Sequence, residues 1–514
     1  MAKEFEKIKW YGKMYGMGKT CRYLKNKVLY GYMDDYPRWQ KKHAISEAEL
    51  AEQRETHFEK EPLISIVVPL YKTPVQYLAA LVESVKAQTY VNWELCLSDG
   101  SGKSESDNDA GGAVQTPLRA MLGHLQGADS RIHVVTSDTP LGISDNTNQA
   151  LSIAKGEYIA FADHDDLLAP NALYENVKEI NKHPDVQFIY SDEDKVDGSG
   201  KRYFMPHFKP DFNLDLLRAR NYICHLVVVS RELYEKIGGL NAEFDGAQDH
   251  DFVFRCVEAV PSNQIRHIPK TLYHWRAYGQ STAEGTENKD YANDAGFRAR
   301  LAHFARMGIP VELEPVQHGG VTYPDMCRVR YQVAGGRDDE FVLIKSEEVQ
   351  AVTEDLFQDM MGYCSQQDVG AVGAKVYAAD GTVFHAGGMM REDGTMCDAF
   401  SGLLYDEPGY FGRAIIAQDT SAVSSLCWMV KKSVLEAIGE SDKLTKTGSK
   451  LSQQDVTEIC IKIREAGYRI VFDAFAEVTC GSNIVESKVE KSRSPIQDLY
   501  YNSNLEQQEA GFDY

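Results

Sequence analysis

The sequence of 514 residues lacks several features that would each indicate a particular class of protein. No apolar run approaches the roughly 20 residues that a membrane-spanning helix needs, and the first residues show no secretory signal pattern. The ten cysteines are scattered and include no CxxC pair, so the sequence predicts neither a zinc cluster nor a disulfide framework. An excess of basic residues is also absent, because 76 Asp and Glu outweigh 55 Lys and Arg and give a formal net charge of −21. A nucleic-acid polymer is therefore excluded as a partner, since phosphate backbones need a basic face.

What remains is the composition of an ordinary globular protein, with 43% hydrophobic and 25% charged residues. At roughly 150 residues per domain, the length predicts two to four domains. Cysteines without a pairing pattern fit a reducing compartment, so we expect a cytoplasmic protein.

The charge is unevenly distributed along the chain. Residues 1–42 contain eleven Lys and Arg against four Asp and Glu, a local +7, and many aromatic residues. Basic residues mixed with amphipathic rings suit an anionic membrane surface, which predicts peripheral contact with the inner face of the cell membrane. The alternative is a helical appendage that packs on the main body or on a partner chain. Residues 44–60 continue as a short polar helix, so 1–60 form the first predicted unit.

From residue 63 the pattern alternates between strands and helices. Apolar runs followed by amphipathic segments predict strands at 63–69, 93–98, 132–136, 158–162 and 187–190, with helices at 74–85, 114–125, 142–154 and 171–182. This spacing is typical of an α/β layer with a mostly parallel sheet. Ligands bind beyond the carboxyl ends of such strands, where Asp99 and Asp163 both stand.

The strongest local motif is Asp163-His164-Asp165-Asp166, directly after an apolar strand. Two unit charges 4 Å apart repel by about 4 kcal/mol at an effective dielectric near 20. A divalent cation relieves that repulsion, and Mg²⁺ and Mn²⁺ prefer carboxylate and phosphate oxygens. The alternative is helix capping before Pro170, but capping needs only one of the three carboxylates.

A weaker internal echo follows. Residues 231–238 precede Gln248-Asp249-His250-Asp251, and residues 432–439 precede Gln454-Asp455-Val456-Thr457 in the same way. The pattern indicates a duplicated half-domain, one copy of which has lost acidic groups.

Several motifs in fixed order resemble the inverting glycosyltransferases of family 2, which have the GT-A fold. The resemblance lies in 64–71, 88–95, Asp99-Gly100-Ser101, 142–148, 156–160 and 163–166. Further motifs at 190–195, 207–211, 221–225 and 273–276 are similar to the bacterial branch that builds rhamnose-containing and related surface polysaccharides. The resemblance implies a catalytic GT-A domain over 61–315, with a mostly parallel central sheet flanked by helices.

The same resemblance implies roles for individual residues. Asp99 contacts the base of a nucleotide-diphospho-sugar donor, dTDP- or UDP-linked, and Asp163 faces the ribose. Thr73 and Asn148 belong to the same nucleotide pocket. The metal, Mn²⁺ or Mg²⁺, is held on the diphosphate by Asp163, Asp165, Asp166 and, as a late ligand, His274.

The catalytic base in this resemblance is Asp249, with Asp251 in reserve. The family usually has Glu-Asp here, whereas this chain has Gln248-Asp249 and lacks the acidic neighbour. Taken without the family, both aspartates are explained by helix capping, and His274 by a structural role among aromatic residues.

The second half, 316–514, resembles the later part of another family 2 domain without its nucleotide-binding segment. Lys345 stands where an acidic metal motif would fall, and a lysine opposes cation binding. We expect a truncated, non-catalytic unit that helps dimerisation or acceptor binding.

The sequence therefore predicts a metal-dependent inverting glycosyltransferase that acts on a glycan or lipid-linked glycan of the bacterial surface. Two alternatives stay open: an inactive carbohydrate-binding scaffold protein, and a nucleotidyltransferase. The nucleotidyltransferase should have a Gly-rich basic loop after its first strand, and Pro69-Leu70-Tyr71-Lys72-Thr73 is not one.

Overall fold

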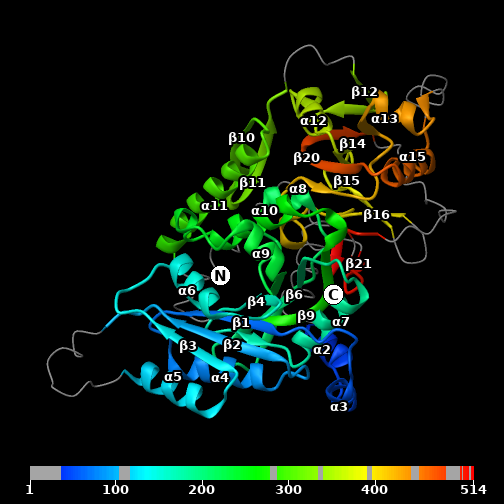
Figure 1. Ribbon diagram of the computed structural model, residues 1–514. Coiled ribbons are helices and arrows are strands. Elements are labelled where there is room, and N and C mark those ends of the chain that lie inside the picture. The colour runs from blue at the N-terminus through cyan, green and yellow to red at the C-terminus, as the bar shows by residue number, and fades with distance from the viewer. Residues whose placement is uncertain are drawn as a thin grey trace, which may run out of the picture.

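Two large β-sheets, each with flanking helices, dominate the computed structural model (Figure 1). The described residues are 36–103, 116–277, 286–333, 340–390, 396–441, 451–481, 498–500, 502–508 and 511–513. The first sheet lies in the lower part of Figure 1, and the second lies at its upper right. We call the parts built around them the first unit and the second unit.

The first sheet has nine strands in the order β3-β2-β1-β4-β8-β6-β9-β5, with β7 paired to β6. Its strands β1 to β4 are mutually parallel, β8 is antiparallel to both β4 and β6, and β9 is parallel to β6. The strands are β1 (Ile64–Leu70), β2 (Trp93–Asp99), β3 (Ile132–Thr136), β4 (Tyr158–Phe161), β5 (Leu167–Leu168), β6 (Phe188–Asp197), β7 (Tyr203–His207), β8 (Val227–Ser230) and β9 (Ile265–Ala277).

Helices cover both faces of this sheet and bury apolar stripes against it. Leu78, Leu81, Val82 and Val85 recur at helical spacing in α4 and are fully buried in the core cluster under β1 and β2. The helices of the first unit are α3 (Glu47–Glu55), α4 (Val75–Lys86), α5 (Pro117–Ala128), α6 (Ile143–Ile153), α7 (Ala172–Lys182), α8 (Leu214–Ala219), α9 (Arg231–Ile237) and α10 (Gln248–Ala259), with short 3-10 turns η2 (Ala242–Phe244) and η3 (Ser262–Gln264). The predicted α/β fold is confirmed.

A helix and a hairpin lie between the two sheets. Helix α11 (Thr286–Arg306) packs along the antiparallel pair β10 (Val311–His318) and β11 (Val321–Tyr331). This hairpin belongs to neither large sheet. Its strand β10 spans residues 315 and 316, between which the sequence predicts a domain boundary.

The second sheet has seven strands in the order β12-β19-β14-β20-β13, with β15 on β14 and β18 on β20. Its strands are β12 (Phe341–Lys345), β13 (Val349–Ala351), β14 (Val369–Tyr377), β15 (Val383–His385), β18 (Gln418–Asp419), β19 (Cys427–Lys431) and β20 (Arg469–Cys480). The pair β16 (Gly388–Met390) and β17 (Met396–Asp398) lies beside it, with the turn η5 (Tyr410–Gly412) and the helices α12 (Leu356–Cys364), α13 (Lys432–Ala437) and α15 (Gln453–Glu465).

Both ends of the described chain return to the first unit. Helix α2 (Tyr36–His43) buries Tyr36 completely against Phe208, beside Leu505 from the C-terminal segment. The last strands, β21 (Glu506–Gln508) and β22 (Gly511–Asp513), pair with each other. In Figure 1 the C-terminus accordingly lies near β9 of the first unit rather than in the second unit.

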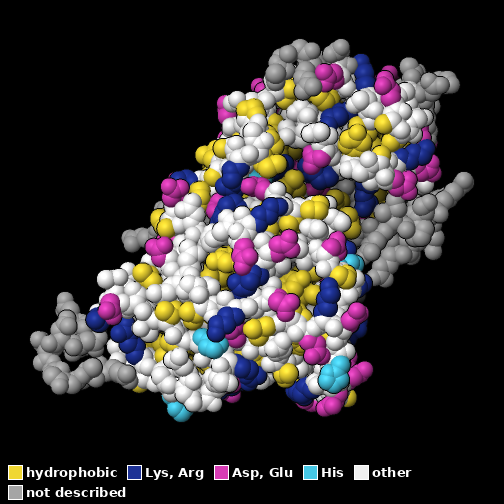
Figure 2. Space-filling model, in the orientation of Figure 1, with side chains coloured by type: hydrophobic (Ala, Val, Ile, Leu, Met, Phe, Trp, Pro, Cys, Tyr) yellow, Lys and Arg dark blue, Asp and Glu magenta, His cyan; other side chains and the backbone are white. Residues whose placement is uncertain are grey.

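The helices can be compared with the absence of a membrane-spanning run in the sequence, and the surface with the acidic net charge. Within the described residues, every helix is too short or too polar to cross a membrane. On the face shown in Figure 2, basic and acidic side chains intermingle, so the net charge of −21 does not gather there into one acidic patch.

Candidate active site

The carboxyl edge of the first sheet carries the acidic motif. Strand β4 is hydrogen-bonded between β1 and β8 and ends at Phe161, so Asp163 follows where ligands bind in parallel α/β sheets. Asp166 is fully buried three residues later. The Tyr273 hydroxyl of β9 donates a 2.6 Å hydrogen bond to Asp166 Oδ2, and the backbone N–H of Arg276 donates to Oδ1 at 2.7 Å.

Three side chains converge at this edge as possible ligands of a metal ion. Asp163, Asp166 and His225 each offer one atom, and these atoms lie within 4.8 Å of one another. His225 Nε2 is 3.6 Å from Asp163 Oδ2. Two carboxylates and an imidazole form a donor set that divalent cations accept, so the residues fit such an ion.

The electrostatics of the three groups are consistent with a place for a cation. Burial raises the pKa of Asp166 well above its ordinary value, and the charges of Asp163 and Asp165 raise it further. Burial would also raise the pKa of Asp163, but the hydrogen bond and charge of His225 outweigh burial and lower it. A bound cation would favour the ionised form of both carboxyl groups.

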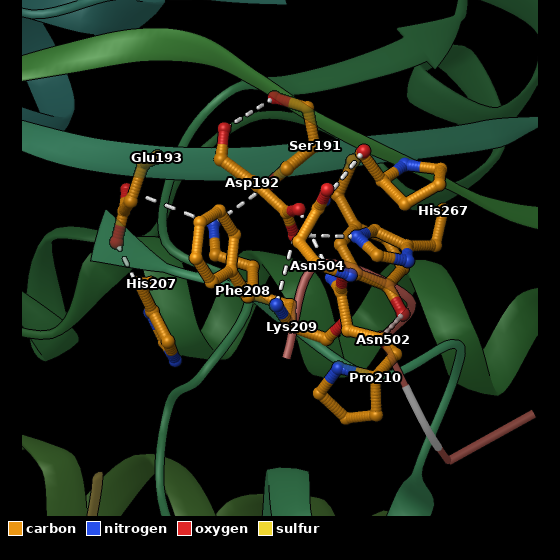
Figure 3. A network of polar contacts seen from close by, with 12 residues as sticks. Ser191, Asp192, Glu193, His207, Phe208, Lys209, Pro210, His267, Asn502 and Asn504 are labelled. Carbon is orange, nitrogen blue, oxygen red and sulfur yellow. Dashed lines mark hydrogen bonds and ion pairs between the residues drawn. The ribbon is translucent and has the colours of Figure 1, made fainter. Parts of the chain in front are cut away.

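His225 lies in the motif at 221–225, for which the sequence predicts no individual role, and the structure reveals what holds it. Both its backbone N–H and its Nδ1 lie 3.1 Å from Glu193 Oε2, which leaves Nε2 directed at Asp163. The completely buried ammonium of Lys209 donates to the backbone carbonyl of His225 at 2.5 Å. It also lies 3.7 Å from Glu193 (Figure 3). A carboxylate behind an imidazole fixes its ring and tautomer, as in many metal sites.

Asp249 stands in the first turn of α10 and is exposed to solvent. Desolvation by the surrounding protein raises the pKa of Asp249; the positive charge of His225 opposes this, and the negative charge of Asp163 adds to it. Asn221 donates a 2.8 Å hydrogen bond from Nδ2 to Asp249 Oδ2. The Oδ1 atom of Asn221 is buried and has no partner among the described residues.

Asp251, the reserve base, has a different environment. It is fully buried, and it accepts hydrogen bonds from Arg255 at 2.8 Å and Arg306 at 3.2 Å. Two guanidinium groups occupy its oxygens, so its geometry is that of a structural ion pair between α10 and α11.

The residues expected to bind the nucleotide lie on the parallel half of the sheet. Asp99 ends β2, and its carboxylate accepts from the Ser101 N–H at 3.0 Å and from Arg119 Nε at 3.2 Å. The buried hydroxyl of Thr73 has no partner among the described residues, so it is available to a ligand.

Asn148, by contrast, is occupied within the fold. Its amide donates to the carbonyl of Leu240 at 2.8 Å and accepts from the Leu240 N–H at 2.8 Å. These two bonds tie α6 to the loop before η2, so the side chain acts as a structural clamp.

Two expected metal ligands stand outside the converging group of Asp163, Asp166 and His225. His274 Nδ1 is 2.6 Å from Asp194 Oδ1, whose other oxygen accepts from the Tyr36 hydroxyl at 2.5 Å. Asp165 is half-buried, and its backbone carbonyl accepts from Arg276 Nε at 2.5 Å. Among the described residues, the histidine that converges with Asp163 and Asp166 is His225.

Comparisons with known proteins agree with the fold. Residues 65–238 match the family described as Glycosyl transferase family 2. The uncharacterized protein y4gI of Sinorhizobium fredii is 33% identical over 496 residues, which cover 81% of this chain and 53% of that protein. The O-antigen biosynthesis protein RfbC of Myxococcus xanthus is 27% identical over 515 residues, covering 86% of this chain and 39% of that protein. The chain spans about half or less of the length of these relatives.

Solved structures with partial likeness include residues 1–349 of TarS from S. aureus in complex with UDP. The TM-score is 0.35 at 18% identity, and the match covers 47% of this chain and 65% of that one. At such values the likeness adds nothing to what the family match and the fold establish. Residues 65–238, which carry the acidic groups at the carboxyl edge of the sheet, thus form a glycosyltransferase family 2 domain.

Proposed function

We propose that this chain is a metal-dependent inverting glycosyltransferase. It moves a sugar from a nucleotide-diphospho-sugar to a hydroxyl group of a bacterial surface glycan, with Asp249 as the general base. The name of the relative RfbC, an O-antigen biosynthesis protein, supports the choice of acceptor class.

The observation that carries the proposal is the placement of Asp249. Its carboxylate is accessible, is oriented by the Asn221 amide and interacts electrostatically with Asp163 and His225 at the carboxyl edge of the sheet. A raised pKa brings a carboxylate nearer to the value that suits a general base at neutral pH. Asp251 lacks these properties because two arginines occupy it.

The chain supplies separate groups for the two ends of the reaction. Asp99 and the free hydroxyl of Thr73 would contact the nucleoside of the donor. Asp163, Asp166 and His225 would hold a divalent cation, Mn²⁺ or Mg²⁺, which when bound neutralises charge on the departing diphosphate. Asp249 would take the proton of the acceptor hydroxyl as that oxygen attacks the anomeric carbon, and a single displacement inverts the centre.

The test is release of nucleoside diphosphate from a panel of UDP-, GDP- and dTDP-sugars, with Mn²⁺ or Mg²⁺ and with a chelator. The wild type should turn over at least one donor only when the metal is present. Asp163→Asn should abolish the metal-stimulated turnover, and Asp249→Asn should abolish sugar transfer. Donor binding without turnover under any metal would favour the inactive scaffold instead.

We further propose that the basic segment before α2 contacts an anionic membrane surface; residues 1–35 lie outside the described residues. Because Tyr36 is buried and bonded to Asp194, a deletion should stop at residue 35 and spare α2. The shortened chain should partition less to vesicles containing phosphatidylserine than the full chain does. Equal partitioning would remove the membrane proposal and leave the enzymatic one intact.

A further inference from the structure

A loop of the second unit, residues 408–413, reaches the first unit beside the candidate active site. The Tyr410 hydroxyl donates to the carbonyl of Pro206 at 2.7 Å and accepts from the Phe208 N–H at 3.0 Å. The loop has positive φ angles at Gly409 (71°), Phe411 (49°) and Gly412 (77°). Glycine adopts such angles freely, whereas a non-glycine residue there costs about 1–3 kcal/mol. Contacts around Phe411 therefore hold it in this conformation.

The first of these contacts leads to the possible metal ligand. The ring of Phe411 stacks on His207, with centroids 4.0 Å apart and planes inclined by 15°. His207 Nδ1 lies 3.4 Å from Glu193 Oε1. The other oxygen of Glu193, Oε2, contacts the backbone N–H and the Nδ1 of His225. Phe411 thus packs on the His207 ring of the His207–Glu193 pair.

The second contact leads to the proposed base. Arg220 donates from Nη1 to the carbonyl of Phe411 at 2.8 Å, and its guanidinium lies 5.8 Å from the Phe411 ring. The next residue is Asn221, whose amide is bonded to Asp249. One residue of the second unit consequently touches a neighbour of each support of the site. These neighbours are His207, which pairs with Glu193 behind His225, and Arg220, which precedes Asn221 beside Asp249.

The C-terminal segment approaches the same supports from another direction. Asn502 is buried and donates from Nδ2 to Asp192 Oδ2 at 2.9 Å and to the carbonyl of Lys209 at 2.8 Å (Figure 3). The Lys209 ammonium in turn donates to the carbonyls of Ile223 and His225 at 2.6 and 2.5 Å. Lys209 therefore links the C-terminal segment to the loop between Asn221 and His225.

We propose that Phe411 is a positioning residue of the first unit's active site, and that the second unit functions as a part of that site. Its ring fixes His207 and Glu193 behind His225, and its backbone fixes Arg220 next to Asn221. The inference rests on the proposed function, because the groups it positions are the proposed metal ligand and the partner of the proposed base.

The test uses the full chain with three substitutions. Phe411→Gly removes the ring and relieves the positive φ, so folding should be nearly unaffected while the bracing is lost. Phe411→Tyr keeps the stacking surface and serves as the conservative rescue. Phe357→Ala is the matched control, because Phe357 is a half-buried aromatic residue that packs within the second unit's own core. The readouts are thermal unfolding, Mn²⁺ affinity without donor, and diphosphate release with kcat and KM resolved.

Outer partners of metal ligands typically contribute 10- to 100-fold to metal affinity, and Phe411 acts one contact further out. We expect Phe411→Gly to weaken Mn²⁺ binding and lower kcat roughly three- to tenfold at unchanged unfolding temperature. Phe411→Tyr should stay within about twofold, and Phe357→Ala should change the unfolding temperature alone.

Two results would overturn the inference. The first is a folded Phe411→Gly variant with wild-type Mn²⁺ affinity and kcat, and the second is an equal loss of Mn²⁺ affinity and kcat in Phe357→Ala. If the wild type releases no diphosphate from any donor, the proposed function fails by itself. The Mn²⁺ titration then still decides the positioning role, because it needs no donor.

Discussion

The two units have a similar arrangement of three strands in their separate sheets, but the residues on these strands differ in chemistry. In the first unit, β8 is antiparallel to β6, and β9 runs parallel to β6 after α10. In the second unit, β19 is antiparallel to β14, and β20 runs parallel to β14 after α15. The sequence echo between 231–238 and 432–439 corresponds to this repeated arrangement, since α9 and α13 follow β8 and β19 directly.

The strand registers allow residues of the two units to be matched. His225 and Leu426 stand at the same distance before α9 and α13. Glu193 and Val376 stand at the same distance after Phe188 and Ala371, which pair with matching residues of β8 and β19. In the second unit, apolar residues therefore occupy the positions that match the possible metal ligand and its supporting carboxylate.

The two helix starts differ in the same sense. Asp249 has the Asn221 amide as its partner and is exposed beside the converging group. Asp455 instead closes a capping box, accepting from the Ser452 hydroxyl at 2.6 Å and from its N–H at 3.1 Å. The apolar pattern that packs the sheet is retained in both units, whereas the polar groups that form a site are present in one.

The largest expected effect comes from substituting each of the two matched aspartates, Asp249 and Asp455, by asparagine. Asp249→Asn should lower sugar transfer by about 10²–10⁴-fold, because the amide cannot accept the proton of the acceptor hydroxyl. Asp455→Asn should leave transfer unchanged and cost at most about 1 kcal/mol of stability through its cap. The measurement is a transfer rate for both variants beside thermal unfolding. A deficit of similar size in both would mean that the two units do not differ as described.

The ion pairs that join the units give the next largest effect. Arg469 of β20 lies 2.6 Å from Asp215 of α8 and also pairs with Asp419 and Asp368. Arg469→Met should lower the free energy of unfolding by about 3–5 kcal/mol, because it removes the guanidinium that pairs with the buried carboxylates of Asp215 and Asp419. Arg330→Met, which breaks half-exposed pairs with Glu314 and Asp359, should cost at most about 1 kcal/mol. Denaturant titration would decide this, and equal costs would contradict it.

Substitution of the matched strand residues Glu193 and Val376 should separate metal binding from stability. Glu193→Gln should weaken Mn²⁺ binding about 10- to 100-fold, since one carbonyl oxygen replaces the charged partner of His225. Val376→Ala should cost about 2 kcal/mol of stability through a cavity and leave Mn²⁺ binding unchanged. Calorimetric titration of both variants tests the pair, and unaltered affinity in Glu193→Gln would exclude a supporting role.

A pH effect is expected from Lys375, which stands where the first unit has Asp192. Its buried ammonium has no hydrogen-bond partner among the described residues, and burial, opposed by Glu477, lowers the pKa of Lys375 to about 8. In the unfolded chain a lysine titrates near pH 10.4, so between about pH 8 and 10 the unfolded state binds more protons. The free energy of unfolding should therefore rise with pH across that window, by about 3 kcal/mol in total.

Lys375→Met should remove this rise and stabilise the protein below pH 8 by a similar amount. Urea midpoints measured from pH 7 to 10 for both proteins test the expectation. Parallel pH profiles would show that the ammonium is not the source of the effect.

The parallel half of the first sheet could be predicted from local sequence. The expected strand at 132–136 coincides with β3, and the other apolar strands and amphipathic helices of that half agree within a few residues. Strand β6 continues through Asp192, Glu193 and Asp194, all buried, where polar residues hide a strand from any hydrophobic pattern. Partners from β7, β9 and the C-terminal segment satisfy these groups, and no local pattern could reveal them.

The candidate site could be predicted only where its residues are neighbours in sequence. The acidic motif at 163–166 stands out because its charges repel one another locally. His225 lies about 60 residues away and enters the group through the antiparallel placement of β8 beside β4. The family resemblance implied His274 as a late ligand, whereas its aromatic neighbours favoured a structural role; in the structure its Nδ1 lies 2.6 Å from Asp194 Oδ1.

We propose one metal-binding active site among the described residues, in the first unit. The most direct test is the number of Mn²⁺ ions bound per chain, measured by titration with electron paramagnetic resonance of the free ion. We expect one tightly bound ion in the wild type and none in Asp163→Asn. Two ions per chain, or one ion retained in Asp163→Asn, would contradict it.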